Sequence, residues 1–466
     1  MAGSYFSSDT IAAVATSLAG DAGVGIIRLS GPDSIAACER VVRGLEKSKP
    51  RYLSRVEIVD PKTAAVVDDG LGVYFPEGQS FTGEEVVELQ LHGGRFLLQS
   101  VLQLLLAEGK CRVALPGEFS FRAVRSGKLS LQGAEAVGQL IHAKSLFEVQ
   151  AARRTLSVQR TERFDRIAAK IRELLAQSEL SIDFIDQDVE VISAQGLKSE
   201  LMKLLNELSD LLLELNAARR IARGLQVTLA GAPNAGKSTL FNALLAEDRA
   251  IVSPEAGTTR DVITEELALG PYLVRLADTA GLRETEGRIE REGIARAQGL
   301  IEASDATLLV VDACDDSAAA LDEFSRMMAT GRVALVALNK ADRVSDPTSV
   351  LAKFVQASGK IPVISISASR GQGISELLEA LRKVLDRQVG IGLNSFLPSE
   401  FQLQMVLQCK EALEQALELV ERTELGHPEL ISASLGSAVR ALSDLVGETT
   451  PDTVLEKIFS EFCIGK

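Results

Sequence analysis

The chain is poor in aromatic residues, histidine and cysteine. It has no tryptophan, and aromatic residues make up 4% of its 466 residues, so we expect cores packed from aliphatic side chains rather than aromatic stacking platforms. Its five cysteines form no C-x-x-C pair, which indicates a reducing compartment and no zinc site. Only three histidines are present, which leaves little for a histidine-based metal centre.

Basic residues and long apolar runs are also scarce. There are 50 Lys and Arg against 64 Asp and Glu, and the formal net charge of −14 argues against nucleic-acid binding driven by overall charge, although a local basic patch is compatible with it. No apolar stretch approaches the roughly 20 residues that span a bilayer, and the N-terminus lacks the pattern of a signal peptide. We therefore expect a cytoplasmic protein with no membrane contact.

A phosphate-binding loop is the strongest motif in the chain. Residues 231–238 match G-x-x-x-x-G-K-[ST], between an apolar run at 225–230 that predicts a buried strand and residues 239–245 that predict a helix. A diphosphate needs converging backbone N–H donors, and the glycines leave that approach free of Cβ atoms. In this pattern Lys237 supplies charge to the outer phosphates and Ser238 supplies a hydroxyl to Mg²⁺.

A second set of motifs predicts that the base is guanine. Asn339-Lys-Ala-Asp342 follows a predicted strand at 333–338, and the Asp342 carboxylate can accept both the ring N1–H and the amine of guanine. Adenine lacks this pair of donors. Asn339 would hold the loop, while Ser367 and Ala368, after a later predicted strand, would close over the base.

A third set of motifs belongs to the Mg²⁺ and γ-phosphate side. Asp278-Thr-Ala-Gly281 follows a predicted strand at 272–277, where Asp278 would hold Mg²⁺ through water and Gly281 would meet the γ-phosphate. Thr258 and Thr259, between this motif and the phosphate-binding loop, supply a second hydroxyl for Mg²⁺. Five motifs in this order and spacing predict GTP binding.

The glutamine that usually orients the attacking water is missing. In Ras-like proteins it follows Asp-Thr-Ala-Gly, whereas this chain has Leu282, which can neither donate nor accept a hydrogen bond through its side chain. Another group must position the water and offset the developing negative charge. For any one candidate taken alone, membership of a solvated charged loop is the better interpretation; the candidates nearby are Arg260, Arg283, Glu284, Glu286 and Glu290.

The pattern along the chain predicts a multidomain protein of mixed α+β and α/β class. Strands are expected at 24–29 and 86–91, and a helix at 96–107. Helical spacing marks two further stretches, with apolar stripes at Leu201, Leu204, Leu208, Leu211 and Leu215 and at Leu403, Leu407, Leu413, Leu417 and Val420. The predicted domains are an N-terminal α+β domain at 1–120, a long-helix domain at 121–219 and 385–466, and a Ras-like P-loop GTPase domain at 220–384 that interrupts it.

Segments along the whole chain resemble one bacterial family. They are GIIRLSG at 25–31, SFTGEEVVE at 80–88, LHGG at 91–94, PGEFS at 116–120, GTTRD at 257–261, DTAGLRE at 278–284 and CIGK at 463–466. With these segments the chain resembles the MnmE (TrmE) family of bacterial tRNA modification GTPases, in the TrmE-Era-EngA-YihA-Septin-like GTPase superfamily.

The resemblance implies a partner, a substrate and a second cofactor. Members of the family form a homodimer through N-terminal domains that look like folate-binding domains, and a hetero-oligomer with the flavin- and NADH-dependent partner MnmG (GidA). Together they add a carboxymethylaminomethyl or aminomethyl group to carbon 5 of the wobble uridine of certain tRNAs, using a 5-formyltetrahydrofolate-type reduced folate. By matching motifs, the folate contacts would be Arg28, Glu88, Lys128 and Lys466.

The resemblance also implies activation by potassium. K⁺ would take the place of an arginine finger, with ligands at Asn234, Ser253, Glu255 and Thr258. Glu290 would orient the attacking water through a second water.

The motifs and the resemblance together give the full set of expected GTP contacts, Mg²⁺ ligands and catalytic residues. The GTP contacts are Asn234, Ala235, Gly236, Lys237, Ser238, Thr239, Ser253, Thr258, Thr259, Asp278, Thr279, Ala280, Gly281, Asn339, Lys340, Asp342, Ser367 and Ala368. The Mg²⁺ ligands are Ser238 and Thr259, and the catalytic residues are Glu290 and Cys463. Cys463 would lie beside the folate in the family; by itself the pattern equally fits a helix-end cysteine packed as a small hydrophobic residue.

A second class of function shares all five nucleotide motifs. A GTP-dependent binding module, such as a ribosome-assembly factor, would carry them without modifying tRNA. A basic or aromatic RNA-binding appendage would favour that alternative, whereas the acidic charge and the folate-like N-terminal motifs favour an enzyme subunit.

Overall fold

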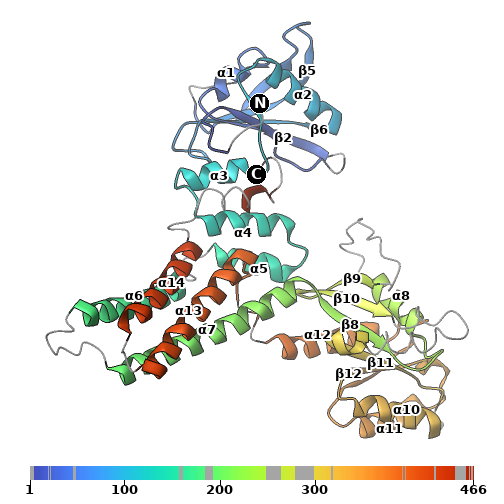
Figure 1. The fold of residues 1–466 in the computed structure, drawn as a ribbon. Coiled ribbons are helices and arrows are strands. Elements are labelled where there is room, and N and C mark those ends of the chain that lie inside the picture. Colours follow the sequence, from blue (N-terminus) through green and yellow to red (C-terminus); the bar gives the residue numbers. More distant parts are fainter. Residues whose placement is uncertain are drawn as a thin grey trace, which may run out of the picture. The chain divides into compact units, whose positions relative to one another are not determined.

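A computed structural model gives the fold in two units (Figure 1). It describes the chain apart from residues 1–4, 19, 21, 46–48, 157–160, 184–192, 248–263, 279–298, 316–317, 391, 394, 424–426, 447–457, 461, 463–464 and 466. Unit 1 contains the segments Met1–Gly138, Thr161–Ile192 and Leu425–Lys466, and unit 2 contains Gln139–Arg160 and Ser193–Glu424. Each unit therefore joins segments that are far apart in the sequence.

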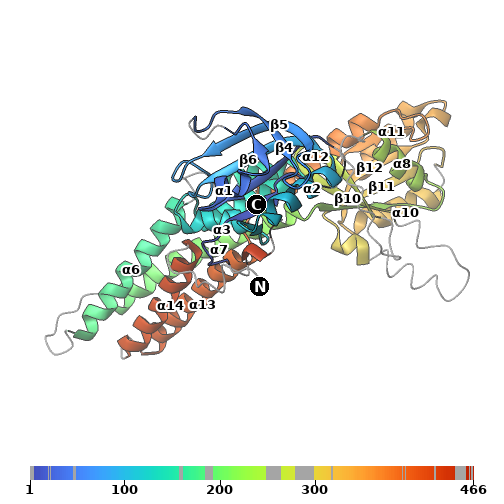
Figure 2. The same ribbon diagram turned by 90° about the horizontal axis from the view of Figure 1, so that it is seen from above.

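Unit 1 is built on a seven-stranded sheet (Figure 2). Its strands are β1 (Ile11–Val14), β2 (Ala22–Ser30), β3 (Val42–Arg43), β4 (Ser54–Val59), β5 (Val66–Phe75), β6 (Val86–Gly93) and β7 (Arg112–Val113). The order across the sheet is β3-β4-β5-β6-β2-β1-β7, and neighbours run antiparallel except β1 and β7.

The two faces of this sheet have different coverings. On one face, α1 (Ser34–Cys38) and α2 (Arg95–Ala107) bury the alternate side chains of the central strands, so that Leu89 packs with Leu98. On the other face, Phe119 of α3 (Glu118–Arg125) packs against Ile11 and Ala13 of β1. Arg28 and Glu88 alternate with the core residues of β2 and β6, and they therefore lie on the α3 face.

The C-terminal segment packs onto the helices that follow this sheet. Phe459 meets Phe121 edge to face at 5.6 Å between ring centroids, and Phe462 lies against Gly138 of α4 (Leu131–His142). The helices α6 (Thr161–Asp183) and α14 (Pro428–Val446) form an antiparallel pair in the same unit, joined by a 2.8 Å hydrogen bond between the hydroxyls of Ser432 and Ser178.

Unit 2 contains a doubly wound sheet. Its strands are β8 (Leu225–Ala230), β9 (Thr264–Leu269), β10 (Tyr272–Asp278), β11 (Ala306–Asp312), β12 (Val333–Asn339) and β13 (Val363–Ser365), in the order β13-β12-β11-β8-β10-β9. Neighbours are parallel except β9 and β10. In such sheets ligands bind at the carboxyl ends of the strands, which is where the predicted nucleotide motifs lie.

Helices cover both faces of this second sheet. Leu240 of α8 (Lys237–Glu247) and Leu381 of α12 (Ile374–Val389) belong to the core on one face. Phe324 of α10 (Ala318–Ala329) and Phe354 of α11 (Pro347–Ser358) pack edge to face on the other, with ring centroids 5.2 Å apart. Figure 1 shows α10 and α11 side by side next to β12.

Unit 2 also contains α5 (Leu146–Thr155) and the long helices α7 (Ala194–Ala222) and α13 (Glu400–Thr423). The two long helices run antiparallel, with Lys198 Nζ 2.8 Å from Glu421 Oε1. The leucine stripe predicted on α7 is confirmed, because all five leucines are buried. The stripe predicted on α13 is wrong at Leu407, which is 46% exposed, because Val406 and Cys409 occupy the buried face instead.

The predicted mixed α+β and α/β class is confirmed by the two sheets and their helices. The predicted strand at 225–230 coincides with β8, and the helix predicted at 96–107 is α2. Among the described residues, no helix is long and apolar enough to cross a membrane.

Candidate functional site

The phosphate-binding loop joins the end of β8 to the start of α8. Gly231 has φ +140°, and a Cβ there would overlap the carbonyl oxygen of Val310 in β11. Gly236 has φ +93°, and a Cβ there would overlap the side-chain nitrogen of Asn339. Both glycines of the motif are therefore required by conformation and by close packing, independently of any ligand.

Lys237 and Ser238 lie at the first turn of α8. Lys237 is 7% exposed, and its Nζ donates to the carbonyl oxygens of Gly231 at 3.0 Å and Ala232 at 2.8 Å. The ammonium group is thus held over the loop whose N–H groups would meet a phosphate. A helix N-terminus adds a favourable field for an anion at this place.

Ser238 lies beside the carboxylate that ends β10. Its Oγ donates to Asp278 Oδ2 at 2.9 Å. The contact follows from topology, because β10 pairs parallel with β8 and Asp278 lies opposite Leu229. A hydroxyl next to a carboxylate is the oxygen-rich environment that Mg²⁺ prefers, so the residues fit this ion.

Asn339 connects three segments of the site. Its Nδ2 donates to the carbonyl oxygen of Ala235 at 2.9 Å, and its Oδ1 accepts from the backbone N–H of Ala368 at 3.0 Å. It is 3% exposed. Asn339 therefore ties the phosphate-binding loop to the segment predicted to close over the base.

Lys340 holds the backbone next to the predicted potassium ligand. Its Nζ donates to the carbonyl oxygen of Asn234 at 2.7 Å and to Asp312 Oδ2 at 2.6 Å. Burial would raise the pKa of Asp312, but the hydrogen bonds from Lys340 and from the Cys314 amide lower it below its usual value. Sequence reasoning missed Asp312, although its position at the end of β11, beside the end of β12, was a usable signal.

Asp342 has two partners at the predicted guanine site. Its Oδ1 accepts from Ser367 Oγ at 2.7 Å, and Arg370 Nε lies 3.2 Å from its Oδ2. The Ser367 hydroxyl and the nearby arginines lower the pKa of Asp342, which keeps the carboxylate charged and able to accept hydrogen bonds. The structure thus brings together Asp342 and Ser367, two residues that the sequence predicted separately at the base, and it adds Arg370, which sequence reasoning missed.

Many predicted residues lie outside the described residues. On the GTPase side these are Ser253, Glu255, Thr258, Thr259, Arg260, Thr279, Ala280, Gly281, Leu282, Arg283, Glu284, Glu286 and Glu290, and at the C-terminus they are Cys463 and Lys466.

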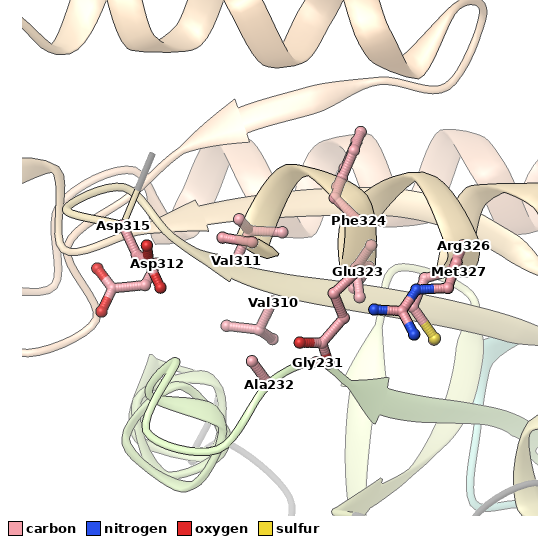
Figure 3. Close-up of a pocket in the computed structure, with 12 residues that line it drawn as sticks. Gly231, Ala232, Val310, Val311, Asp312, Asp315, Glu323, Phe324, Arg326 and Met327 are labelled. Atoms are coloured by element: carbon pink, nitrogen blue, oxygen red, sulfur yellow. The ribbon is translucent and has the colours of Figure 1, made fainter. Parts of the chain in front are cut away.

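A pocket of about 250 Å³ lies on another side of the phosphate-binding loop (Figure 3). Gly231 and Ala232 line it, together with the end of β11 and the side chains of Glu323 and Arg326 from α10. Lys237, Ser238 and Asp342 do not line this pocket. This pocket is therefore not the predicted nucleotide site, which those three residues define.

The predicted folate residues lie in unit 1. Arg28 of β2 and Glu88 of β6 are cross-strand neighbours, and Arg28 Nε lies 2.7 Å from Glu88 Oε1. The Arg28 guanidinium also lies 5.6 Å from the centroid of the Phe119 ring and 6.0 Å from that of Phe81. Phe81 is 41% exposed and was not predicted as part of the site.

Lys128 and the C-terminus approach the same region. Lys128 Nζ donates to the carbonyl oxygen of Gly78 at 2.6 Å, in the loop that carries Phe81. Gly465, with φ +95°, is packed against the backbone of Val14 in β1, next to Ala13, which pairs with Arg28.

The glycine loop, the Ser238–Asp278 pair and the Asn339–Asp342 segment, at the carboxyl ends of parallel strands, define a P-loop GTPase domain. Comparison with known proteins agrees. The family model "MnmE helical domain" matches residues 131–463, and "GTP-binding protein TrmE N-terminus" matches residues 10–128. The chain belongs to the MnmE family of tRNA modification GTPases, and it is a GTPase that acts in tRNA modification.

Relatives of this family match the chain from end to end. The tRNA modification GTPase MnmE of Heliobacterium modesticaldum is 36% identical over 98% of this chain and 99% of its own, and that of Proteus mirabilis is 36% identical over 99% and 100%. The one from Xylella fastidiosa strain 9a5c is 37% identical over 98% of each chain. Among solved structures, the G domain of the T. maritima FeoB iron transporter covers 34% of this chain at 26% identity, but its TM-score of 0.27 is too low to support a conclusion.

Proposed function

We propose that the protein is a K⁺-activated GTPase that, with the flavoprotein MnmG, modifies carbon 5 of the wobble uridine of certain tRNAs with a one-carbon unit from a reduced folate. The reaction would take place in the cytoplasm, and the protein would act as a homodimer. The observation that carries the GTPase part is the contact between Ser238 and Asp278 at the base of the phosphate-binding loop.

The residues around the loop fit the binding of GTP and Mg²⁺. Backbone N–H groups of residues 231–238 would meet the phosphates, and Lys237 would add positive charge. Ser238, with Thr259, would hold Mg²⁺, and Asp278 would act through water. Asp342 would accept the two donors of guanine, held in place by Ser367 at 2.7 Å.

Asn234 supports the proposal of potassium activation. Its backbone is fixed with φ 63° by the hydrogen bond from Lys340, while the residue itself is exposed. An exposed amide oxygen on a fixed backbone suits a monovalent cation, with Ser253, Glu255 and Thr258 as further ligands. Bound K⁺ would supply the positive charge that an arginine finger supplies elsewhere. Because Leu282 cannot orient water, Glu290 would do so.

Potassium activation is tested by GTP turnover in KCl and NaCl at equal ionic strength. We expect turnover to be at least tenfold faster in KCl for the wild type, and Asn234→Ala to lose that difference while it keeps its affinity for GDP. Glu290→Ala should lower turnover in KCl without changing GTP affinity, because water positioning acts mainly in the transition state. Equal wild-type rates in both salts would contradict the proposal.

Arg28, Glu88, Lys128 and Lys466 support a folate site in unit 1. A folate offers a glutamate tail that suits cations and a pterin ring whose donors suit a carboxylate. Arg28 lies near the rings of Phe119 and Phe81, and Phe81, which is 41% exposed, offers a flat apolar surface for a ring. Cys463 would lie close by. Calorimetric titration of a reduced folate should show weaker binding after Arg28→Ala and after deletion of Gly465 and Lys466, with GTP turnover unchanged.

Exposed apolar side chains at one end of the unit 1 sheet support dimerisation there. They belong to the start of β2, the start of β5 and the segment after β6, which the strand register brings to the same end: Val24 (57% exposed), Val66 (56%) and Phe96 (85%). An apolar surface of this kind suits a contact with a second copy of the domain. Sedimentation of Val24→Asp/Phe96→Asp should show a monomer where the wild type is a dimer.

A further inference from the structure

We propose that the β3–β4 edge of the unit 1 sheet binds the anticodon loop of the RNA substrate. The surface consists of Arg43, Lys49, Arg51, Tyr52 and Arg55, at and beside strands β3 and β4, and is called the basic edge below. The proposal rests on the proposed function, since it concerns where the tRNA of that reaction is held.

Residues 40–55 carry a net positive charge, although the chain as a whole is acidic. Residues 40–55 contain the basic residues Arg40, Arg43, Lys47, Lys49, Arg51 and Arg55 and only one acidic residue, Glu46, whereas the whole chain has a formal net charge of −14. All five members of the basic edge are exposed, and one of them, Arg55, has its Nη2 3.3 Å from Asp69 Oδ2, which offsets part of its charge. Concentrated cations on an acidic protein attract a polyanion locally, while the rest of the surface repels it.

An exposed aromatic ring lies among these cations. Tyr52 is 54% exposed, and Lys49 Nζ lies 5.2 Å from the centroid of its ring. An accessible ring flanked by a cation is the arrangement on which unpaired bases stack. Double-stranded nucleic acid has no unstacked base to offer, so the surface fits a single-stranded loop.

The backbone of the basic edge is held in an unusual conformation. Arg51 has φ 61°, which is uncommon for a residue with a Cβ, and its N–H donates to the carbonyl oxygen of Tyr74 at 2.8 Å. The turn anchors the start of β4 to the end of β5 and leaves Arg51 and Tyr52 outside the ladder. Strained backbone conformations such as this one cluster at functional sites, where they hold side chains in position to bind.

The basic edge lies across the sheet from the predicted folate residues. Arg28 pairs with Glu88, Glu88 with Val73, and the residue before Val73 with Ser54, so three steps between strands lead from Arg28 to the start of β4. At about 4.8 Å per step the separation is about 14 Å. Alternation along the strands puts Arg55 on the same sheet face as Arg28.

That separation suits an anticodon loop. A loop held by its phosphates and one stacked base at the basic edge would have neighbouring nucleotides within reach of Arg28. The turn that carries Lys49, Arg51 and Tyr52 lies beside Tyr74 near the end of β5, whereas Val66, which is proposed for dimerisation, lies at the start of β5.

The test measures binding of a fluorescent anticodon stem-loop RNA to the full chain by anisotropy, over a series of salt concentrations. The variant Lys49→Ala/Arg51→Gly removes two charges, and glycine accepts the φ of residue 51. We expect affinity at least tenfold weaker in about 0.1 M salt, and a shallower salt dependence, because each lost phosphate contact lowers the slope by about 0.7 for single strands. The matched control Lys62→Ala/Lys110→Ala removes two exposed charges elsewhere in unit 1 and should bind like the wild type.

A second pair of variants separates stacking from charge. Tyr52→Ala should weaken RNA binding by about tenfold without changing its salt dependence. Tyr52→Phe, which keeps the ring, should bind RNA with the affinity of the wild type. The proposal is overturned if the wild type does not bind the stem-loop, if the control pair loses as much affinity as Lys49→Ala/Arg51→Gly, or if the latter binds normally.

Complementation distinguishes this proposal from the proposed function. If Lys49→Ala/Arg51→Gly loses wobble-uridine modification in a deletion strain but keeps RNA affinity, the basic edge binds an acidic protein instead, and the RNA proposal is overturned. If the wild-type gene itself does not restore modification, the proposed function fails, whatever the binding result.

Discussion

Asn339 lies so close to Gly236 that any Cβ at residue 236 would overlap its side-chain nitrogen. The guanine motif and the phosphate motif, which are about a hundred residues apart, thus share one packed contact. Since Asn339 also bonds Ala235 and Ala368, the shape of the phosphate-binding loop depends on the segment that would receive the base.

Gly236→Ala should therefore abolish GTP binding, with an affinity loss of at least about a hundredfold, or about 2.7 kcal/mol. The matched control is Gly331→Ala, whose φ of +67° is also left-handed but whose Cβ would meet nothing within 4 Å. It should bind GTP normally. Titration with a fluorescent GTP analogue compares the two, and equal losses would show that backbone strain rather than overlap is responsible.

Asp342→Asn should exchange guanine for xanthine specificity. A carboxylate accepts the two adjacent donors of guanine. The asparagine amide offers both a donor and an acceptor, and its donor matches the C2 carbonyl of xanthine. We expect GTP affinity to fall by about a hundredfold and XTP affinity to rise, with Ser367 still able to bond the side-chain oxygen. Competition binding with GTP and XTP measures both, and unchanged selectivity would remove Asp342 from the base site.

Glu118→Ala should strongly destabilise unit 1. The Glu118 side chain is fully buried and accepts hydrogen bonds from Arg112, Arg122 and the N–H of Leu115, at 2.7 to 2.9 Å. Removing one partner of a buried ion network leaves the others uncompensated and costs about 3–5 kcal/mol. The free energy of unfolding in urea measures this.

The matched control for Glu118 is Glu39→Ala. Its carboxylate is 64% exposed and lies 3.9 Å from Lys110 Nζ, so its loss should change the free energy of unfolding by less than about 1 kcal/mol. Equal effects of the two substitutions would show that burial of the Glu118 network does not matter.

His92 should make the stability of unit 1 depend weakly on pH. The hydrogen bond to Asp68, 2.7 Å from Nδ1, raises the pKa of His92 above its usual 6.5. Because the pKa is raised in the folded state, the stabilisation is fully present below 6.5 and is lost as pH rises through the raised pKa. In an NMR titration, Asp68→Asn should return the His92 midpoint toward 6.5; an unchanged midpoint would contradict the pairing.

Local motifs predicted the strand, the loop and the helix start because such motifs are short and depend on the backbone. The phosphate-binding loop needs a strand, two glycines and a helix start, and all four can be recognised within fourteen residues around Lys237. Asp312 and Arg370 escaped prediction because their roles arise only when strand ends meet at the sheet edge. Phe81 beside Arg28 and the burial of Val406 rather than Leu407 depend likewise on tertiary packing.

Composition also concealed the basic edge. The net charge of −14 and the aromatic content of 4% argued against an RNA-stacking surface, because averages over 466 residues hide a cluster within sixteen. A windowed charge count would have identified residues 40–55. Only the structure shows that Tyr52 is exposed and that the Lys49 ammonium lies near its ring.

The central claim is that GTP hydrolysis by this protein serves wobble-uridine modification. The most direct measurement is mass spectrometry of nucleosides from tRNA of a strain that lacks the gene, complemented with the wild type, Arg28→Ala or Gly236→Ala. We predict that only the wild type restores the modified wobble uridine to normal levels, because the other two would lose the proposed folate site and the GTP site. Normal modification without the gene, or in cells carrying Gly236→Ala, would contradict the claim.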